Sequence, residues 1–440
     1  MSSFRYFFNI YFILLFTISG LGAFSQNVLF FSTFFLQFFF ILSVLFSKKN
    51  FFIPKITIFY AMFLIFSFPA IFFYSFNKAL AIEGLIYWLN LILIFIFLYN
   101  NKPIINTIID WVIKRLPLFF IFLFVISYFN NHQLAKQLDL TEYNLFFPFY
   151  KSNNHLGSYL GLVILYFFIE KNFLFLLIFI PFYLISFNRS GYLASFLSFS
   201  LILFFFYKKF FINIKEKNKA INLIIFLLLL TTVIFFTIKS FSSNRLIEPR
   251  LIYFYVTLKT IINQPMGIGF YNFGDVSLKY PRIGFFTSET HNIFLEILIG
   301  GGVVAFVFFI IFFILIIKNI YENNKKIFLL IIYLTIVFSF SYIYNNFFFF
   351  IFFFALLVYG YEEKEAIEVN FLNRKNKFLL LLPSILVFLF FLSFVLNRYF
   401  YFQKKYQLAY FFYPLDRQTN INYITELVNN KKIKTAIEII

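Results

Sequence analysis

The sequence predicts an all-α fold, a polytopic bundle of membrane helices, and three observations lead to this class. Of the 440 residues, 62% are hydrophobic and only 12% are charged, which is the composition of a chain embedded in lipid. Long apolar runs recur along the chain between short polar loops. The Lys and Arg residues gather in alternate loops, where basic residues set the orientation of membrane helices.

Because a spanning helix needs about 20 mainly apolar residues, the apolar runs predict about 13 transmembrane helices within residues 1–397. The first run is long and ends without a clear cleavage site, so we expect a retained helix there and not a signal peptide. The predicted helices cover residues 6–24, 28–47, 56–76, 80–99, 116–130, 155–170, 172–188, 190–207, 220–238, 291–317, 327–344, 346–361 and 378–397.

The charge of the loops predicts which side of the membrane each one faces. With the N-terminus inside, the cytoplasmic loops hold most of the Lys and Arg of the short loops, as the positive-inside rule requires. The short outer loops carry Lys78, Lys136, Lys151 and Arg189. We therefore expect four segments on the extracytoplasmic side, namely the loop 131–154, the turn 188–190, the loop 239–290 and a helical tail, 398–440, that contains the C-terminus.

The composition excludes several kinds of function. The chain has no Cys, so it has no disulfide, no thiolate metal site and no Cys nucleophile. Its net charge of +19 comes from cations scattered between apolar runs, which membrane orientation explains better than nucleic-acid binding does. No glycine-rich phosphate loop and no acidic cluster is recognisable, so we expect no metal and no nucleotide or other cofactor.

The long outer loop is predicted to contain a short helix from Pro249 to Asn263. Proline suits the first position of a helix, and Pro265 with the glycine-rich turn that follows, up to Gly269, ends it. Arg250 opens this helix, where the dipole and the free backbone amides also favour an anion. The alternative is that Arg250 only anchors the loop to lipid headgroups.

The same loop ends in front of an apolar helix that Ser288 or Thr290 can cap. His291 would lie in the first turn of this helix, whose dipole favours a neutral imidazole that can accept a proton from a hydroxyl. Arg189 begins another span and can bind a phosphate through two guanidinium nitrogens. The alternatives are an interfacial histidine with satisfied hydrogen bonds and an arginine that snorkels to the membrane surface.

Two anion-binding arginines and one base on the same side of the membrane suit the displacement of a pyrophosphate by a hydroxyl. This chemistry predicts glycosyl transfer from a lipid-linked donor. A flippase or transporter is the first alternative, although Glu83 and Glu296, the main ionisable candidates within spans, and Glu170 at an inner edge form no recognisable relay. A structural factor of a glycan-export machine, which would need neither the histidine nor the arginines, is the second.

Two motifs resemble the O-antigen ligase and polymerase superfamily, which includes bacterial O-oligosaccharyltransferases. The first is an Arg-x3-Leu pattern from Arg189 to Leu193, and the second is His291-Asn292 followed after nine residues by Gly302. Between them, Arg250 leads a helix that ends in a Pro-x-Gly-x-Gly turn, as in the family.

One further stretch matches the family pattern, and one position departs from it. Asn153-Asn154-His155 with Gly157 resembles the family's Asn-rich entry to a span. Ala305 stands where the family usually has Gly, Thr or Tyr, a departure that concerns helix packing.

The resemblance implies a metal-independent, inverting glycosyltransferase of the GT-C-like, all-helical membrane class in the bacterial inner membrane, acting in cell-envelope and lipopolysaccharide biosynthesis. Its donor would be an undecaprenyl-diphosphate glycan. Arg189 and Arg250 would hold the diphosphate, and His291 would activate or orient the acceptor hydroxyl. Residues with minor roles would be Asn292, His155, Arg245, Lys279 and Arg282. The acceptor would be lipid A core, with a growing glycan or a protein hydroxyl as alternatives.

In the tail, Ala409, Pro414, Asp416 and Ala436 are spaced loosely like a helical-hairpin repeat. A single repeat does not form a solenoid by itself, so we expect a pair of helices lying on the surface.

Overall fold

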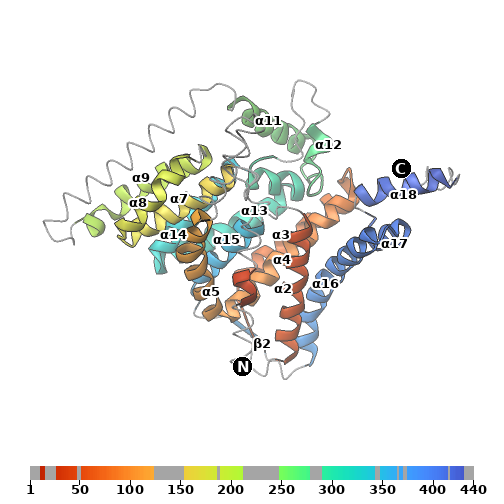
Figure 1. Ribbon diagram of the computed structural model, residues 1–440, viewed down its shortest axis with the longest axis horizontal. Helices are drawn as coiled ribbons and strands as arrows, with labels where there is room; N and C mark the ends of the chain where they lie inside the picture. The colour runs from red at the N-terminus through yellow and green to blue at the C-terminus, as the bar shows by residue number, and fades with distance from the viewer. Residues whose placement is uncertain are drawn as a thin grey trace.

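The computed structural model describes residues 10–14, 26–46, 51–122, 153–185, 189–211, 247–277, 290–341, 347–363, 366–369, 374–414 and 417–430. These residues are mostly helical (Figure 1).

The helices before the long loop are α2 (Gln26–Phe46), α3 (Thr57–Pro69), η1 (Ala70–Tyr74), α4 (Lys78–Asn100), α5 (Lys102–Ile109), η2 (Asp110–Arg115), α7 (Asn153–Ile169), α8 (Phe173–Ile185) and α9 (Arg189–Phe211). The later ones are α11 (Ile247–Asn263), α12 (Phe273–Ser277), α13 (Ile293–Asn323), α14 (Lys325–Phe340), α15 (Phe347–Gly360), α16 (Arg374–Phe402), α17 (Tyr406–Phe412) and α18 (Arg417–Asn429).

Among the described residues, four helices are long and apolar enough to cross a membrane. They are Thr57–Tyr74, which joins α3 and η1, Lys78–Asn100, Ile293–Asn323 and Leu380–Phe402 within α16. Shorter apolar helices coincide with further predicted spans: Thr33–Leu45, His155–Ile169, Leu174–Leu184, Ser190–Ile202 and Phe348–Gly360. The number of about 13 spans stays a prediction. The predicted span 220–238, most of 6–24, the end of 116–130 and most of the loop 131–154 lie outside the described residues.

One prediction about local structure was wrong. The segment predicted as a cytoplasmic loop before residue 116 is helical, as α5 and η2. The described residues are mostly helical, as predicted, and in addition β1 (Phe51–Ile53) pairs antiparallel with β2 (Ile367–Val369). Each strand is three residues long, too short for the alternation of apolar and polar residues that marks a strand in a sequence.

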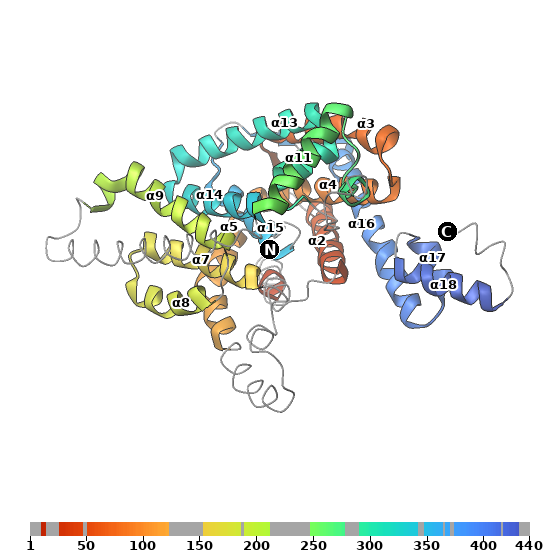
Figure 2. The ribbon, with the colours of Figure 1, turned by 90° about the horizontal axis from the view of Figure 1, so that it is seen from above.

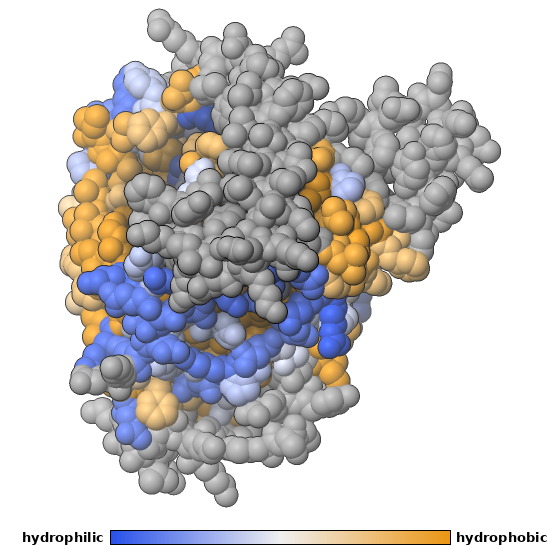
Figure 3. All heavy atoms as spheres, turned by 90° about the vertical axis from the view of Figure 1, so that its left-hand side faces the viewer, coloured by the Kyte–Doolittle hydropathy of each residue, from blue (hydrophilic) through white to orange (hydrophobic). Residues whose placement is uncertain are grey.

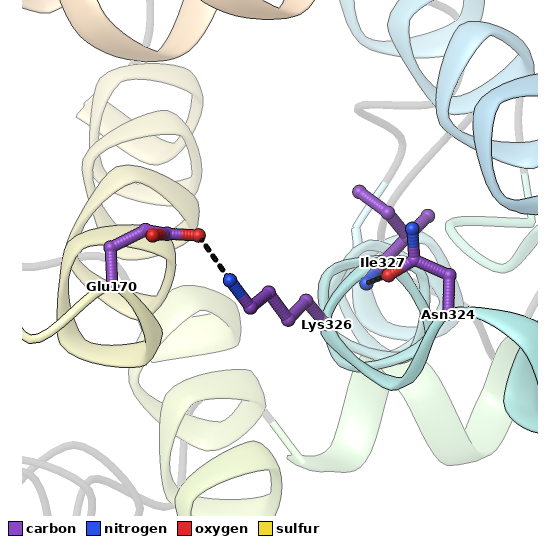
Figure 4. Close-up of polar contacts among 4 residues, drawn as sticks. All are labelled: Glu170, Asn324, Lys326 and Ile327. Atoms are coloured by element: carbon purple, nitrogen blue, oxygen red, sulfur yellow. Dashed lines mark hydrogen bonds and ion pairs between the residues drawn. The ribbon is translucent and has the colours of Figure 1, made fainter.

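Segments that the loop charges assigned to the cytoplasm meet at one end of the bundle. The strands β1 and β2 pair there, and the Lys102 ammonium donates to the Tyr361 carbonyl at 3.1 Å. Lys326 of α14 forms an ion pair with Glu170, which follows α7, at 2.8 Å (Figure 4). Seen from the left of Figure 1, hydrophilic residues form a band across the lower part of the surface, below a large apolar area (Figure 3). The side of the membrane that these segments face stays a prediction.

Aromatic rings fill the core between α3, α4 and α13, which accounts for part of the large phenylalanine content. The ring centroids of Phe63 lie 5.6 Å from Trp88 and 5.4 Å from Phe309 in edge-to-face arrangements. Phe270, which follows the glycine-rich turn, lies 6.0 Å from Trp88. Such pairs contribute about 0.5–1.5 kcal/mol beyond the burial of their area. They fix the end of the long loop to the bundle.

The helices of the tail pack on the end of α16, and one residue after α17 reaches the bundle. The helix α16 extends to Phe402, and α17 and α18 follow it at the right of Figure 1. The Asn397 amide donates to the Ala409 carbonyl at 2.7 Å. The Tyr413 hydroxyl donates to Glu83 of α4 at 2.9 Å, so this buried carboxyl is a partner of the tail.

Candidate functional site

The glycine-rich turn of the long loop docks into a break in α13. The helix has non-helical backbone angles at Gly302, so backbone groups on either side are free to pair with the turn. The hydrogen bonds are Ile268 N to Ile299 O at 2.9 Å, Gly269 N to Gly300 O at 3.1 Å and Val303 N to Pro265 O at 2.9 Å. The two glycine motifs of the sequence therefore form one structural unit.

Only glycine fits this unit at two of its positions. Gly302 has φ +86° and Gly267 has φ +85°, a left-handed region that side chains disfavour. A Cβ on Gly302 would lie 2.4 Å from the carbonyl carbon of Met266, and a Cβ on Gly267 would lie 2.6 Å from the Gly302 nitrogen. These glycines are required because the backbone of the turn lies directly against the backbone of α13, and not only because the chain bends there.

The docked turn holds α11 against α13 and brings its first half to His291. The Tyr253 ring stacks on the imidazole, with centroids 5.3 Å apart and planes 14° apart. Arg250 lies three residues before Tyr253, hence on the same side of α11. Burial first, and the Arg250 guanidinium second, lower the pKa of His291 from 6.5 to about 4. The sequence predicted a neutral imidazole from the helix dipole, and burial and Arg250 act in the same direction.

His291 precedes its helix, and Asn292 is the cap, which corrects the prediction of Thr290 as cap and of His291 in the first turn. The Asn292 side-chain oxygen accepts from the amides of Phe294 at 2.8 Å and Leu295 at 3.1 Å, and its amide donates to the Ser339 carbonyl at 2.9 Å. The other predicted cap, Ser288, lies outside the described residues. His291 itself has φ +54°, a conformation that costs about 1–3 kcal/mol and persists only when its surroundings enforce it.

The buried carboxylate of Glu296 helps to hold the backbone of His291 in this conformation. Its Oε2 atom lies 3.0 Å from the Thr290 hydroxyl and accepts from the Thr290 amide at 3.3 Å. The backbone amide of Tyr271 faces the same carboxylate. Glu296 therefore links the backbone of Tyr271 to Thr290, directly before His291. Neither Glu296 nor Tyr253 was predicted to belong to the site, although the i, i+3 spacing from Arg250 signals Tyr253.

The other predicted site residues lie apart from this unit or outside the described residues. Arg189 is the first residue of α9, and its side chain is outside the described part, as are Arg245, Lys279 and Arg282. The Tyr192 hydroxyl of α9 donates to the Leu184 carbonyl of α8 at 2.8 Å, so the two helices are joined close to Arg189. His155 is buried in α7, with its ring centroid 6.1 Å from that of Phe349.

Comparison with known families agrees with these motifs. The O-antigen ligase family model matches residues 173–310, a stretch that contains Arg189, Arg250 and His291. This stretch is similar to an O-antigen ligase domain. The resemblance to the O-antigen ligase superfamily is thus confirmed over these residues, and together with the apolar helices it indicates a membrane protein. No curated protein and no solved structure matches the chain.

Within the described residues of the O-antigen ligase domain and the rest of the bundle, no three His, Asp or Glu side chains lie close enough to hold a metal ion. The polar groups that the described structure brings together are the Arg250 guanidinium, the His291 imidazole and the Asn292 amide. They offer one cation and one neutral base at the end of α13.

Proposed function

We propose that the protein is an inverting, metal-independent glycosyltransferase that moves a glycan from an undecaprenyl-diphosphate donor to a hydroxyl acceptor, with lipid A core as that acceptor. The reaction would take place on the periplasmic face of the bacterial inner membrane, with the N-terminus cytoplasmic and the C-terminus periplasmic. The observation that carries the proposal is the partly buried His291, which stacks on Tyr253 beside Arg250 and whose pKa is lowered to about 4. The O-antigen ligase domain supports the reaction class.

In this reaction the acceptor oxygen attacks the anomeric carbon of the glycan while its proton passes to His291. The bond from that carbon to the diphosphate oxygen breaks, and the electron pair leaves with the diphosphate. Arg250, together with Arg189, would stabilise the charge that develops on the leaving group. A bound diphosphate would also offset the field of Arg250 at the imidazole, which makes His291 a stronger base in the complex than in the free protein.

Deletion of the gene followed by analysis of surface glycan tests the proposal. Loss of ligation predicts full-length polymer that remains unattached to lipid A core. A cell surface capped with single repeats would instead identify a polymerase, and loss of a glycoprotein with normal lipopolysaccharide would identify a protein O-oligosaccharyltransferase. Unchanged glycan in all three assays would contradict the proposed function.

The pH dependence of transfer should report on the Tyr253 stack. His291 acts as a base only when neutral, so the wild-type rate should be level above about pH 5 and fall near pH 4. Tyr253→Ala exposes the imidazole to water and so reduces its burial, which is the largest cause of the lowered pKa of His291. The acid limb of the profile should therefore move up toward about pH 6.5, whereas Tyr253→Phe should keep the wild-type profile. Superimposable profiles for Tyr253→Ala and wild type would refute this role.

Substitution of Arg250 should weaken both the binding of the diphosphate donor and the stabilisation of the leaving group, which kcat/KM reports together. A hydrogen bond to a charged group contributes about 1.5–3 kcal/mol, so Arg250→Ala should lower kcat/KM by about 10- to 100-fold. Arg250→Lys should recover only part of this loss, since an ammonium cannot form the paired contact. Lys259→Ala, an exposed cation on the same helix, is the matched control. Equal effects of the Arg250 and Lys259 substitutions would count against a specific anion site.

A further inference from the structure

The exposed side of α11 carries a continuous apolar stripe. Its members recur three or four residues apart and so share one side of the helix. They are Leu251, Phe254, Tyr255, Leu258, Ile262 and, just beyond the helix, Met266. Ile262 is 77% exposed. The opposite side of the helix is buried against α13 and α12, so the stripe faces away from the protein.

This stripe continues into the apolar surface of a candidate membrane span. Met266 belongs to the turn that docks at the break in α13, where the Val303 amide donates to the Pro265 carbonyl at 2.9 Å. The next exposed residues of α13 are Val303, Val304 and Val307, on a helix long and apolar enough to cross the bilayer. Figure 2 shows α11 lying across α13. The two helices thus present one apolar surface.

The length of α13 gives the depth at which α11 lies. From Gly302 to Lys318, the first basic residue beyond the break, an α-helix rises about 24 Å. The hydrocarbon core is about 30 Å thick, so with Lys318 at one boundary the docked turn lies about 6 Å inside the other. A helix that lies in the membrane surface buries its apolar side to about 5–10 Å. The end of α11 is therefore at the depth of such a helix.

We infer that α11 is an interfacial helix whose apolar stripe inserts among the phospholipids of the leaflet on the side of the candidate site. Lys259 and Asn263, four residues apart and both exposed, form a polar edge of the stripe that faces the headgroups. The helix thereby holds Arg250 and His291 at the level of the lipid phosphates. This placement follows from exposure and depth, and it is independent of the proposed reaction.

Spin labelling tests the inference directly, because the natural chain has no cysteine and each single cysteine is a unique attachment point. Leu258→Cys and Ile262→Cys report on the stripe, Asn263→Cys on its polar edge and Val307→Cys on lipid contact. Each labelled full-length protein is placed in vesicles of phosphatidylethanolamine and phosphatidylglycerol. Collision rates are then measured with oxygen, which concentrates in lipid, and with a water-soluble nickel chelate.

The labels at 258 and 262 are expected to behave like the label at 307, with a collision rate for oxygen several-fold higher than that for the nickel chelate. The label at 263 is expected to collide more often with the nickel chelate than with oxygen. Nickel access at 258 and 262 equal to that at 263 would place the stripe in water and overturn the inference. Protection from both reagents would mean that protein covers the stripe, and dipolar broadening between labels at 262 would identify that protein as a second copy. Either of these results also overturns it.

Discussion

The variant His291→Ala is expected to transfer glycan about 10²–10⁴-fold more slowly than the wild type, because general base catalysis by a positioned side chain contributes a factor of this size. The imidazole is neutral, stacked on Tyr253 and next to the arginine proposed to hold the leaving group. The carboxyl group of the described site, that of Glu296, is buried and bonded to the Thr290 hydroxyl and amide. The measurement is transfer in vitro from a purified lipid-linked donor.

Backbone strain must be separated from chemistry in this experiment, since His291 has φ +54°. Asparagine tolerates that conformation better than most residues, so His291→Asn keeps the backbone and removes the base. Both variants should lose transfer to the same extent. Asn292→Ala, by contrast, removes a helix cap and should cost about 1 kcal/mol of stability with a much smaller loss of transfer. Activity near that of wild type in His291→Asn would show that the imidazole is not the base.

The helices and the residues of the site were predictable from the sequence to different degrees. Apolar runs of sufficient length marked α4, α13 and α16 because a bilayer imposes one length on every span. The Arg250 helix and its glycine-rich turn were predictable because proline and glycine have local backbone effects. These are properties of single residues or of short windows.

Contacts between distant segments were not predictable in the same way. The pair Glu83 and Tyr413 joins residues 330 positions apart, and one sequence holds no signal for it. Asn292 displaced Thr290 as the cap because the Thr290 hydroxyl and amide face Glu296 instead. The stacking of Tyr253 on His291 depends on the break at Gly302, which sets where α11 lies. The chemistry of the site thus rests on packing that only the folded chain reveals.

The variant Gly302→Ala is expected to lower the free energy of unfolding by about 3 kcal/mol or more and to abolish transfer. A residue with a Cβ pays about 1–2 kcal/mol for a left-handed conformation. The new Cβ would also meet the Met266 carbonyl at 2.4 Å, so the turn must move and its three backbone hydrogen bonds weaken, each with a net contribution of about 0.5–1.5 kcal/mol. Thermal unfolding in detergent and the transfer assay measure the two effects.

The sign of the stability change decides whether the break in α13 is a real feature of the fold. At an ordinary helical position, replacing glycine by alanine stabilises a helix by about 0.8–1 kcal/mol. A more stable Gly302→Ala protein would therefore mean that α13 runs straight through this position and that the glycine-rich turn does not dock there. Val304→Ala, two residues further along and 44% exposed, should change stability by less than about 0.5 kcal/mol. We therefore expect Gly302→Ala to be destabilised and Val304→Ala to be unaffected. This result would mean that the turn docks against α13 at Gly302, and that this docking brings Tyr253 and Arg250 to His291.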